Sequence, residues 1–295
     1  GTVDGKLPAC GHGVHTAMLL GAAQYLAETR NFDGTAVMIF QPAEEHGGGA
    51  LEMCKDDLMS RWGIQEVYGM HNMPEYPVGE FAICSGPLMA AADEFVLTIT
   101  GRGGHAAAPH EAVDPNVAAA HVILALQSVA SRVVDPLSSV VVTVCALHSD
   151  TDASNVIPQS VYMRGTVRTL DPKVRDLAEE KVTQLVTLTA QAHGCIGDVD
   201  YLRGYPVTVN AEANTGYAAE AAHAVAGSVE AETPPIMAAE DFSYMLEERP
   251  GAYIMLGNGE GATVHHPEYN FNDEAIPAGC SWWAGIIEQR MPVMN

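Results

Sequence analysis

Apolar residues recur with helical spacing in some stretches of the chain and form short unbroken runs in others. His15–Arg30 keeps its apolar residues on one helical face, and Ala50–Trp62 also suits a helix. Thr35–Phe40 and Glu66–Met70 are short apolar runs, which predict buried strands of a parallel sheet. A helix between two parallel strands gives a right-handed crossover, and ligands bind at the carboxyl ends of such strands.

The pattern changes near residue 92. Glu94–Thr100 alternates apolar and polar positions, as a strand with one buried face does. Asp-Pro pairs then open two predicted helices, because proline is favoured in the first helical turn. These helices extend over 114–132 and 171–193, and the further strand candidates are Val140–Leu147, Val161–Leu170 and Asp198–Arg203. The order βαββαβ predicts an independent antiparallel α+β unit.

The α/β pattern returns from about Tyr205, with predicted helices over 211–226, 239–247 and 276–290 and a strand at Ala252–Gly257. We therefore predict an α/β protein in two parts. A discontinuous, mostly parallel domain covers residues 1–91 and 206–295, and a smaller βαββαβ domain covering residues 92–205 is inserted into it.

Composition excludes several classes of function. The chain has 14 basic and 37 acidic residues and a net charge of −23, which argues against a nucleic-acid partner. The longest nearly apolar stretch, Val117–Leu126, is far shorter than the roughly 20 residues that span a bilayer, so we expect no membrane association. No secretory signal is visible, and the six scattered cysteines form no CxxC pair. We therefore expect reduced thiols and a cytoplasmic location.

Two local clusters contain side chains that could carry chemistry. Cys10 and His12 stand just before a predicted helix, and a thiolate and an imidazole one residue apart can converge on one transition-metal ion. A buried thiol beside a helix-capping histidine is the alternative. Glu44 and Glu45 follow the apolar run Thr35–Phe40, so that one carboxylate could bind a metal while its neighbour moves protons. A solvated acidic pair is the alternative there.

Two histidines stand at similar places in the predicted topology. His71 follows the run Glu66–Met70, and His265 lies in the loop after Ala252–Gly257. A single histidine at a strand end is ordinarily only a hydrogen-bonded polar residue. In a parallel sheet, however, these residues would share one rim with the two clusters, and together they make up the set of ligands that a two-metal hydrolytic site needs.

The order of nine motifs along the whole chain resembles one known family. ACGHxxH, QPAEE, GMHN, GRGGHAAAPH, NVIP, RGTVRT, RGYP, AEDF and VHHPxYxFND follow one another as in the M20 metallopeptidases. The resemblance is to the amidohydrolase branch, which contains N-acyl-amino-acid, hippurate and indole-acetyl-amino-acid hydrolases. It implies a two-metal catalytic domain interrupted by a dimerisation or lid domain.

The resemblance also implies roles for individual residues. The metal ligands fall on Cys10, His12, Glu45, His71 and His265. They would hold two divalent ions, with Mn, Zn, Co and Ni fitting about equally. The general base falls on Glu44, and His105 is the lid histidine that reaches the partner subunit's site. Asn155 and Arg203 are candidates for holding the substrate's carboxylate, and Glu240 either lines the pocket or opens a helix. The implied substrate is a small N-acyl amino acid, and the implied assembly is a homodimer formed through the inserted domain.

The match departs from the family at its start. The family usually has HxCGHDxH, whereas this chain has Pro8 and Gly13 at the first histidine and the aspartate. A missing aspartate could remove a side chain that orients a ligand. The chain also begins only nine residues before Cys10, so we expect a catalytic sheet without its opening strands. An alternative function follows, in which a catalytically impaired relative acts as a dimeric binding protein.

Overall fold

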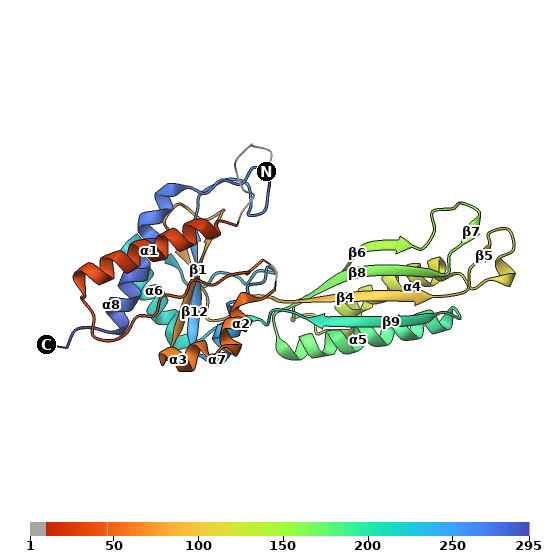
Figure 1. The fold of residues 1–295 in the computed structure, drawn as a ribbon, viewed down its shortest axis with the longest axis horizontal. Helices are drawn as coiled ribbons and strands as arrows, with labels where there is room; N and C mark the ends of the chain where they lie inside the picture. Colours follow the sequence, from red (N-terminus) through yellow and green to blue (C-terminus); the bar gives the residue numbers. More distant parts are fainter. Residues whose placement is uncertain (1–9, 46, 295) are drawn as a thin grey trace. The chain divides into compact units, whose positions relative to one another are not determined.

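The computed structural model describes residues 10–45 and 47–294, so Pro8 lies outside the described residues. The chain divides into two compact units (Figure 1). The first unit comprises Gly1–Leu88, Thr208–Pro235 and Asp241–Asn295. The second unit comprises Met89–Val207 and, in addition, Ile236–Glu240, a return of the chain that no sequence pattern indicated.

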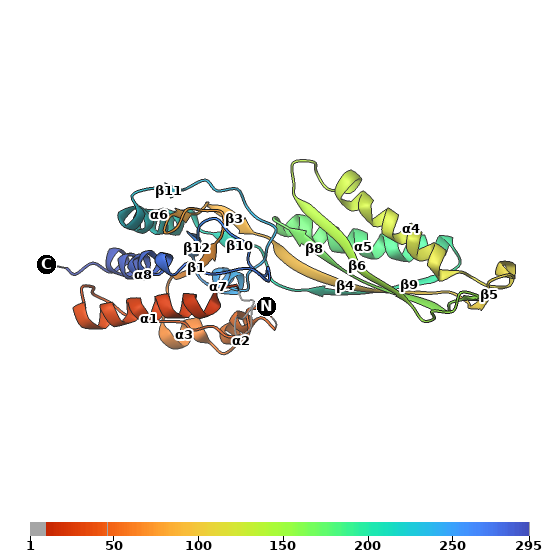
Figure 2. The same ribbon diagram turned by 90° about the horizontal axis from the view of Figure 1, so that it is seen from above.

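The second unit is an antiparallel sheet with two helices on one face (Figure 2). Its strand order is β6-β8-β4-β9, and its element order is β-α-β-β-α-β apart from one short extra pair. The strands are β4 (Ala91–Thr100), β6 (Val140–Ser149), β8 (Ser160–Thr169) and β9 (Ile196–Arg203). The helices are α4 (Pro115–Ser128) and α5 (Pro172–Ala192), and the short pair is β5 (Gly104–His105) with β7 (Val156–Ile157).

Both helices start at an Asp-Pro pair, as predicted. The Asp114 carboxylate accepts a hydrogen bond from the Asn116 amide at 2.9 Å, and the Asp171 carboxylate accepts one from the Lys173 amide at 2.7 Å. Each aspartate therefore caps its helix, and the proline that follows occupies a position that needs no amide donor. Inward residues of β4, among them Phe95 and Leu97, are fully buried against both helices.

Helix α4 continues into a π-helical turn, Val129–Val133. Together they form the one helix in the described chain that is long and apolar enough to cross a membrane, with a mean hydropathy of 1.2. Its buried residues Val122 and Leu126 pack into the core of the second unit. Of its apolar window, 28% is buried, and core helices and signal sequences pass the same test of length and composition.

The first unit contains a mixed sheet with the order β1-β12-β2-β11. The strands are β1 (Val67–Met73), β2 (Phe81–Ala82), β11 (Val229–Glu230) and β12 (Gly251–Gly257). β12 pairs with β1 in parallel and with β2 in antiparallel orientation, and β11 is parallel to β2. A second ladder joins β3 (Gly86–Met89) to β10 (Thr208–Asn210). The sheet is therefore not uniformly parallel.

Helices pack around this sheet. They are α1 (His12–Thr29), α2 (Gly49–Lys55), α3 (Leu58–Trp62), α6 (Glu212–Ala226), α7 (Ser243–Glu248) and α8 (Ile276–Arg290), with 3₁₀ turns at Pro109–Glu111 in the second unit and Asp273–Ala275 in the first. The core of the first unit is built from α1, α6, α8 and the strands, and Trp282 is fully buried at its centre together with Met18 and Ile254. Burial of such large apolar side chains is the main stabilising contribution.

Two predictions for the first unit are wrong. Thr35–Phe40 is not a strand: no described strand pairs with it, and Phe40 is 46% exposed. An apolar run indicates a tendency to be buried, but a strand also requires a hydrogen-bonded neighbour. The predicted helix Ala50–Trp62 is two helices, because Asp57 adopts a left-handed backbone conformation (φ 59°) that an α-helix does not allow.

Candidate metal centre

Cys10 and His12 are placed by the start of α1. Gly11 lies between them as the N-cap and has a φ of 94°. A side chain at Gly11 would also bring its Cβ within 2.4 Å of Asn72 Oδ1, so only glycine fits here. The tight turn brings the buried Cys10 close to the end of β1.

His71 lies inside β1 and not after it, because the strand continues to Met73. Its Nε2 lies 3.1 Å from Cys10 Sγ. Its Nδ1 donates to the backbone carbonyl of Asn72 at 2.6 Å. With the proton on Nδ1, the Nε2 lone pair faces the thiol, and this is the tautomer that binds a metal through Nε2.

Glu44 and Glu45 lie in the loop between residue 40 and α2. Asp241 holds both ends of this loop, since its carboxylate accepts hydrogen bonds from Gln41 Nε2 and, at 2.9 Å, from the Ala50 amide. Glu44 Oε2 lies 3.6 Å from His12 Nε2, and Glu45 Oε1 lies 3.9 Å from His265 Nε2.

The structure brings all five predicted ligands together. They form two groups, Cys10–His12–His71 and Cys10–Glu45–His265, and the acid pair forms a third group with His12. Within each group the candidate ligand atoms lie within 4.8 Å of one another. Metal–ligand bonds of about 2.0–2.3 Å place the ligands of a tetrahedral ion about 3.3–3.8 Å apart, so small side-chain movements would close each group around an ion. The set of donors, one thiolate, three imidazoles and a carboxylate, suits a zinc-like cation.

Like groups crowd together at this site. Burial, followed by repulsion from Glu45 and Asp241, raises the pKa of Glu44 to about 7. Burial, with repulsion from His12 and His265 as smaller causes, lowers the pKa of His71 to about 4. Metal ligation requires neutral imidazole, and a cation would relieve the repulsion among the carboxylates. The electrostatics of the site therefore favour a bound cation.

Four residues that surround this centre have no role predicted from the sequence. They are Asp241, which holds the Glu44 loop, and three residues in contact with the ligand-bearing segments, His15, Asn72 and Tyr269. The only signal was their position within or beside the quoted motifs. Their contacts join segments that are distant in sequence, which no local pattern records.

The second unit contains the remaining predicted residues. His105 and Asn155 come together where β5 meets β7, since the Ala106 amide donates to the Asn155 carbonyl at 3.0 Å and both side chains are exposed. Arg203 forms ion pairs with Asp176 at 2.7 Å and Glu179 at 2.5 Å. Glu240 is 5% exposed. The catalytic role predicted for His105 and the substrate-binding roles predicted for the other three residues stay predictions.

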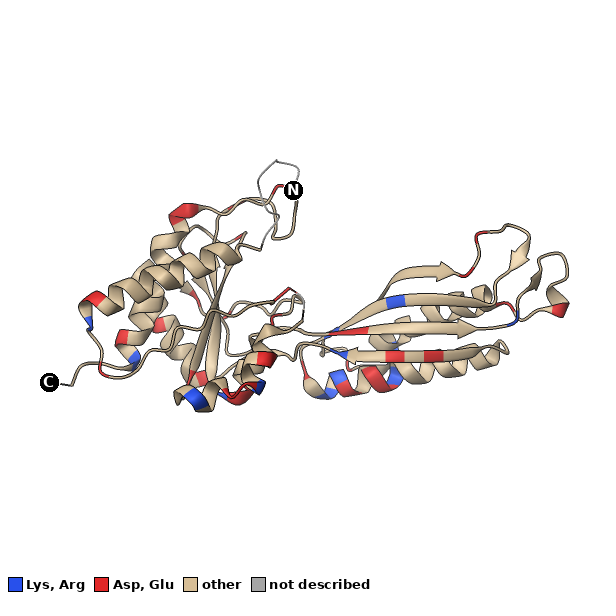
Figure 3. Ribbon diagram, viewed as in Figure 1, with Lys and Arg blue, Asp and Glu red and all other residues tan. Residues whose placement is uncertain are grey.

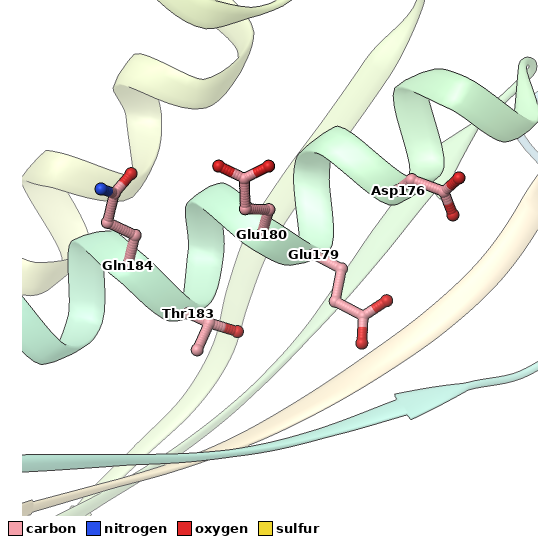
Figure 4. Close-up of a pocket in the computed structure, with 5 residues that line it drawn as sticks. All are labelled: Asp176, Glu179, Glu180, Thr183 and Gln184. Atoms are coloured by element: carbon pink, nitrogen blue, oxygen red, sulfur yellow. The ribbon is translucent and has the colours of Figure 1, made fainter.

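Acidic positions gather along α5 and β9 (Figure 3). A shallow hollow on α5 contains none of the predicted site residues (Figure 4). The residues that line it are Asp176, Glu179, Glu180, Thr183 and Gln184.

Similarity to known proteins identifies the family. The model of the peptidase family M20/M25/M40 matches residues 1–289. The chain belongs to this family.

The amidohydrolase resemblance is also supported by curated relatives. The chain is 40% identical over 273 residues to the N-acetyl-L-cysteine deacetylase of Bacillus subtilis, an alignment that covers 92% of this chain and 65% of the relative. It is 39% identical to the hippurate hydrolase of Campylobacter jejuni, over 96% of this chain and 74% of the relative.

A solved M20 structure shares the fold. It is a Bacillus subtilis peptidase described as dinuclear metal-binding, with a TM-score of 0.81, 31% identity, and coverage of 97% of this chain and 73% of that one. This M20 chain therefore spans about two thirds to three quarters of the length of these relatives.

Proposed function

We propose that this M20 chain is a metal-dependent amidohydrolase that cleaves the amide bond of small N-acyl amino acids. The proposal rests chiefly on one observation: the Glu44 carboxylate lies beside the two groups of candidate metal ligands, 3.6 Å from His12. The names of the hippurate hydrolase and the N-acetyl-L-cysteine deacetylase support the substrate class.

The five ligands would hold two divalent cations, with Cys10 within reach of both groups. When bound, such cations polarise an acyl carbonyl and make a water molecule more acidic. The family member described as dinuclear supports the number of ions. Mn, Zn, Co and Ni stay equally suitable for this set of donors.

Glu44 would carry the proton transfers. Its carboxylate accepts a proton from the attacking water and later delivers it to the nitrogen of the leaving amine. A pKa raised to about 7 suits both steps, because the group can exist in either form near neutral pH. Asp241 keeps Glu44 in place by holding the two ends of its loop.

The second unit would contribute to substrate binding and assembly. We include His105 in the proposal as a catalytic residue, and Asn155, Arg203 and Glu240 as residues that bind the substrate. A homodimer formed through this unit is also part of it. Within the unit, the sheet face opposite α4 and α5 carries no helix, and Tyr162 and Leu202 on this face are 40% and 49% exposed. Apolar residues on an uncovered sheet face are compatible with an interface between subunits.

Elemental analysis of the purified protein, together with hydrolysis of hippurate and N-acetyl amino acids, tests the proposed function. We expect two equivalents of divalent metal and release of the free amino acid. A folded, metal-loaded sample that cleaves no acyl-amino acid would contradict the proposal. If calorimetry then shows that the sample binds these compounds, the alternative of a binding protein is supported. Gly13, which replaces the usual aspartate, is the observation that favours this alternative.

A further inference from the structure

One buried side chain in the first unit contacts three separate segments. Asn72 is fully buried, directly after His71 in β1. On α1, His15 Nε2 accepts a hydrogen bond from the Asn72 backbone amide at 3.0 Å and lies 2.6 Å from Asn72 Oδ1. The Asn72 Nδ2 donates to the Tyr269 hydroxyl at 2.5 Å. Both ends of the amide group therefore contact side chains that lie 57 and 197 residues away in the sequence.

Each of these segments carries a candidate metal ligand. The α1 segment begins with Cys10, Gly11 and His12, and Gly11 approaches Asn72 so closely that no side chain fits between them. The backbone carbonyl of Asn72 accepts a hydrogen bond from His71 Nδ1 and so fixes the orientation of the His71 ring. The Tyr269 amide donates to the His266 carbonyl at 2.9 Å, next to His265. Four of the five candidate ligands thus lie on segments that the Asn72 side chain joins.

We propose that His15, Asn72 and Tyr269 form a positioning cluster that sets the spacing of the metal ligands before any ion binds. The inference rests on the metal centre of the proposed function. Its physical basis is preorganisation, because ligands already held near their bound positions lose less conformational freedom when an ion arrives. None of the three residues needs to touch the ion.

Titration of the metal-free protein with Co²⁺ tests this proposal. The thiolate-to-cobalt absorption band reports the bond to Cys10, and competition with a chelator gives the Co²⁺ dissociation constant. We expect Asn72→Ala to raise the dissociation constant about tenfold to a hundredfold and to change the band. Tyr269→Phe, which removes one hydroxyl group, should have the same effects at the lower end of that range.

Two control variants separate positioning from simple structural support. Asn210 is another buried asparagine of the first unit, bonded to Cys84 and Tyr253, and Tyr76 is another half-buried tyrosine, whose hydroxyl bonds to Thr233 at 2.5 Å. Asn210→Ala and Tyr76→Phe should lower the melting temperature of the metal-free protein while leaving the cobalt band and affinity unchanged.

The possible results lead to distinct conclusions. Wild-type affinity and spectrum in both Asn72→Ala and Tyr269→Phe would overturn the cluster's role while leaving the metal centre intact. A cobalt band that changes equally in the control variants would also overturn it. If Asn72→Ala does not fold, Tyr269→Phe compared with Tyr76→Phe decides the question. A folded wild-type protein that binds no Co²⁺ would overturn the metal centre, and the cluster's role with it.

Discussion

The two units bury charged groups in opposite ways. In the second unit, Asp93 is 1% exposed and its carboxylate is matched by the Arg175 guanidinium, with additional hydrogen bonds from the Tyr201 hydroxyl and the Gly204 amide, both at 3.0 Å. In the first unit, carboxylates stand beside carboxylates and imidazoles beside imidazoles. The ring centroids of His15 and His71 are 4.6 Å apart, for example.

This contrast separates structural from functional use of buried polar groups. A buried ion pair with all its hydrogen bonds made needs no further counter-charge, whereas removal of one partner leaves an uncompensated buried charge and is strongly destabilising. Crowded like groups need an added counter-charge: burial, and to a smaller extent repulsion from neighbouring like groups, raises the pKa of Glu44 and lowers that of His71. If the proposed metal centre is correct, this crowding lowers the stability of the metal-free first unit, and a bound cation offsets it.

Glu44→Gln should have the largest effect on function. We expect turnover of N-acyl amino acids to fall by about 10²- to 10⁴-fold, because the proton acceptor is lost. The free energy of unfolding should stay the same or rise, because the substitution removes one of several carboxylates that repel one another. Steady-state kinetics, elemental analysis and urea denaturation measure these quantities. The neighbouring variant Glu45→Gln should instead lose metal, and retained turnover in Glu44→Gln would remove Glu44 from its role.

Arg175→Met, in the second unit, should lower the free energy of unfolding, whereas Glu44→Gln should leave it unchanged or raise it. The Asp93 carboxylate would stay buried without its cation, which costs about 3–5 kcal/mol of unfolding free energy. Urea denaturation followed by circular dichroism measures the loss. Arg164→Met is the control, because its ion pair with Glu94 is exposed and should cost only about 0.2–1 kcal/mol. Equal losses in both variants would contradict the contrast between the two units.

Removal of metal should destabilise the first unit selectively. An ion present at a hundred times its dissociation constant stabilises the folded state by about 2.7 kcal/mol, and a chelator removes this stabilisation. Hydrogen exchange with and without a chelator can locate the effect. We expect faster exchange in α1 and β1 and unchanged exchange in β4 and β8. Uniform acceleration in both units would show that the ion's effect is not local.

Two glycines near the site should respond differently to the same substitution. Gly11→Ala forces a Cβ against Asn72 and imposes a strained backbone, so we expect a loss of about 1–3 kcal/mol together with weaker metal binding. Nothing lies within 4 Å of a Cβ at Gly13, an exposed helical position, so Gly13→Ala should stabilise slightly, by up to about 1 kcal/mol. Thermal melting and the Co²⁺ dissociation constant test both. Similar effects in the two variants would contradict a specific requirement at Gly11.

The four long strands and the two long helices of the second unit were predictable because their signals are local, whereas β5, β7 and the segment Ile236–Glu240 were not. The alternation in β4 and the Asp-Pro pairs that start α4 and α5 each depend only on residues that are adjacent in the sequence. The first unit was less predictable. β2 and β11 have two residues each, too short for any period, and the apolar run Thr35–Phe40 carries no information about a pairing partner.

The candidate site shows the same limit. Cys10, Glu44 and His71 could be singled out from residue type and motif order. The contacts of Asn72 with His15 and Tyr269 could not, because they join residues that come together only when the first unit folds.

The sulfur of Cys10 belongs to both groups of candidate ligands, and this has a consequence for damage by air or peroxide. Oxidation of that one atom to a sulfenic or sulfinic acid would remove a donor from both ion positions at once. On the proposed function, both positions would then bind their ions more weakly, because each would keep only two of its three grouped ligands. A reductant that acts on sulfenic acids would restore both positions together.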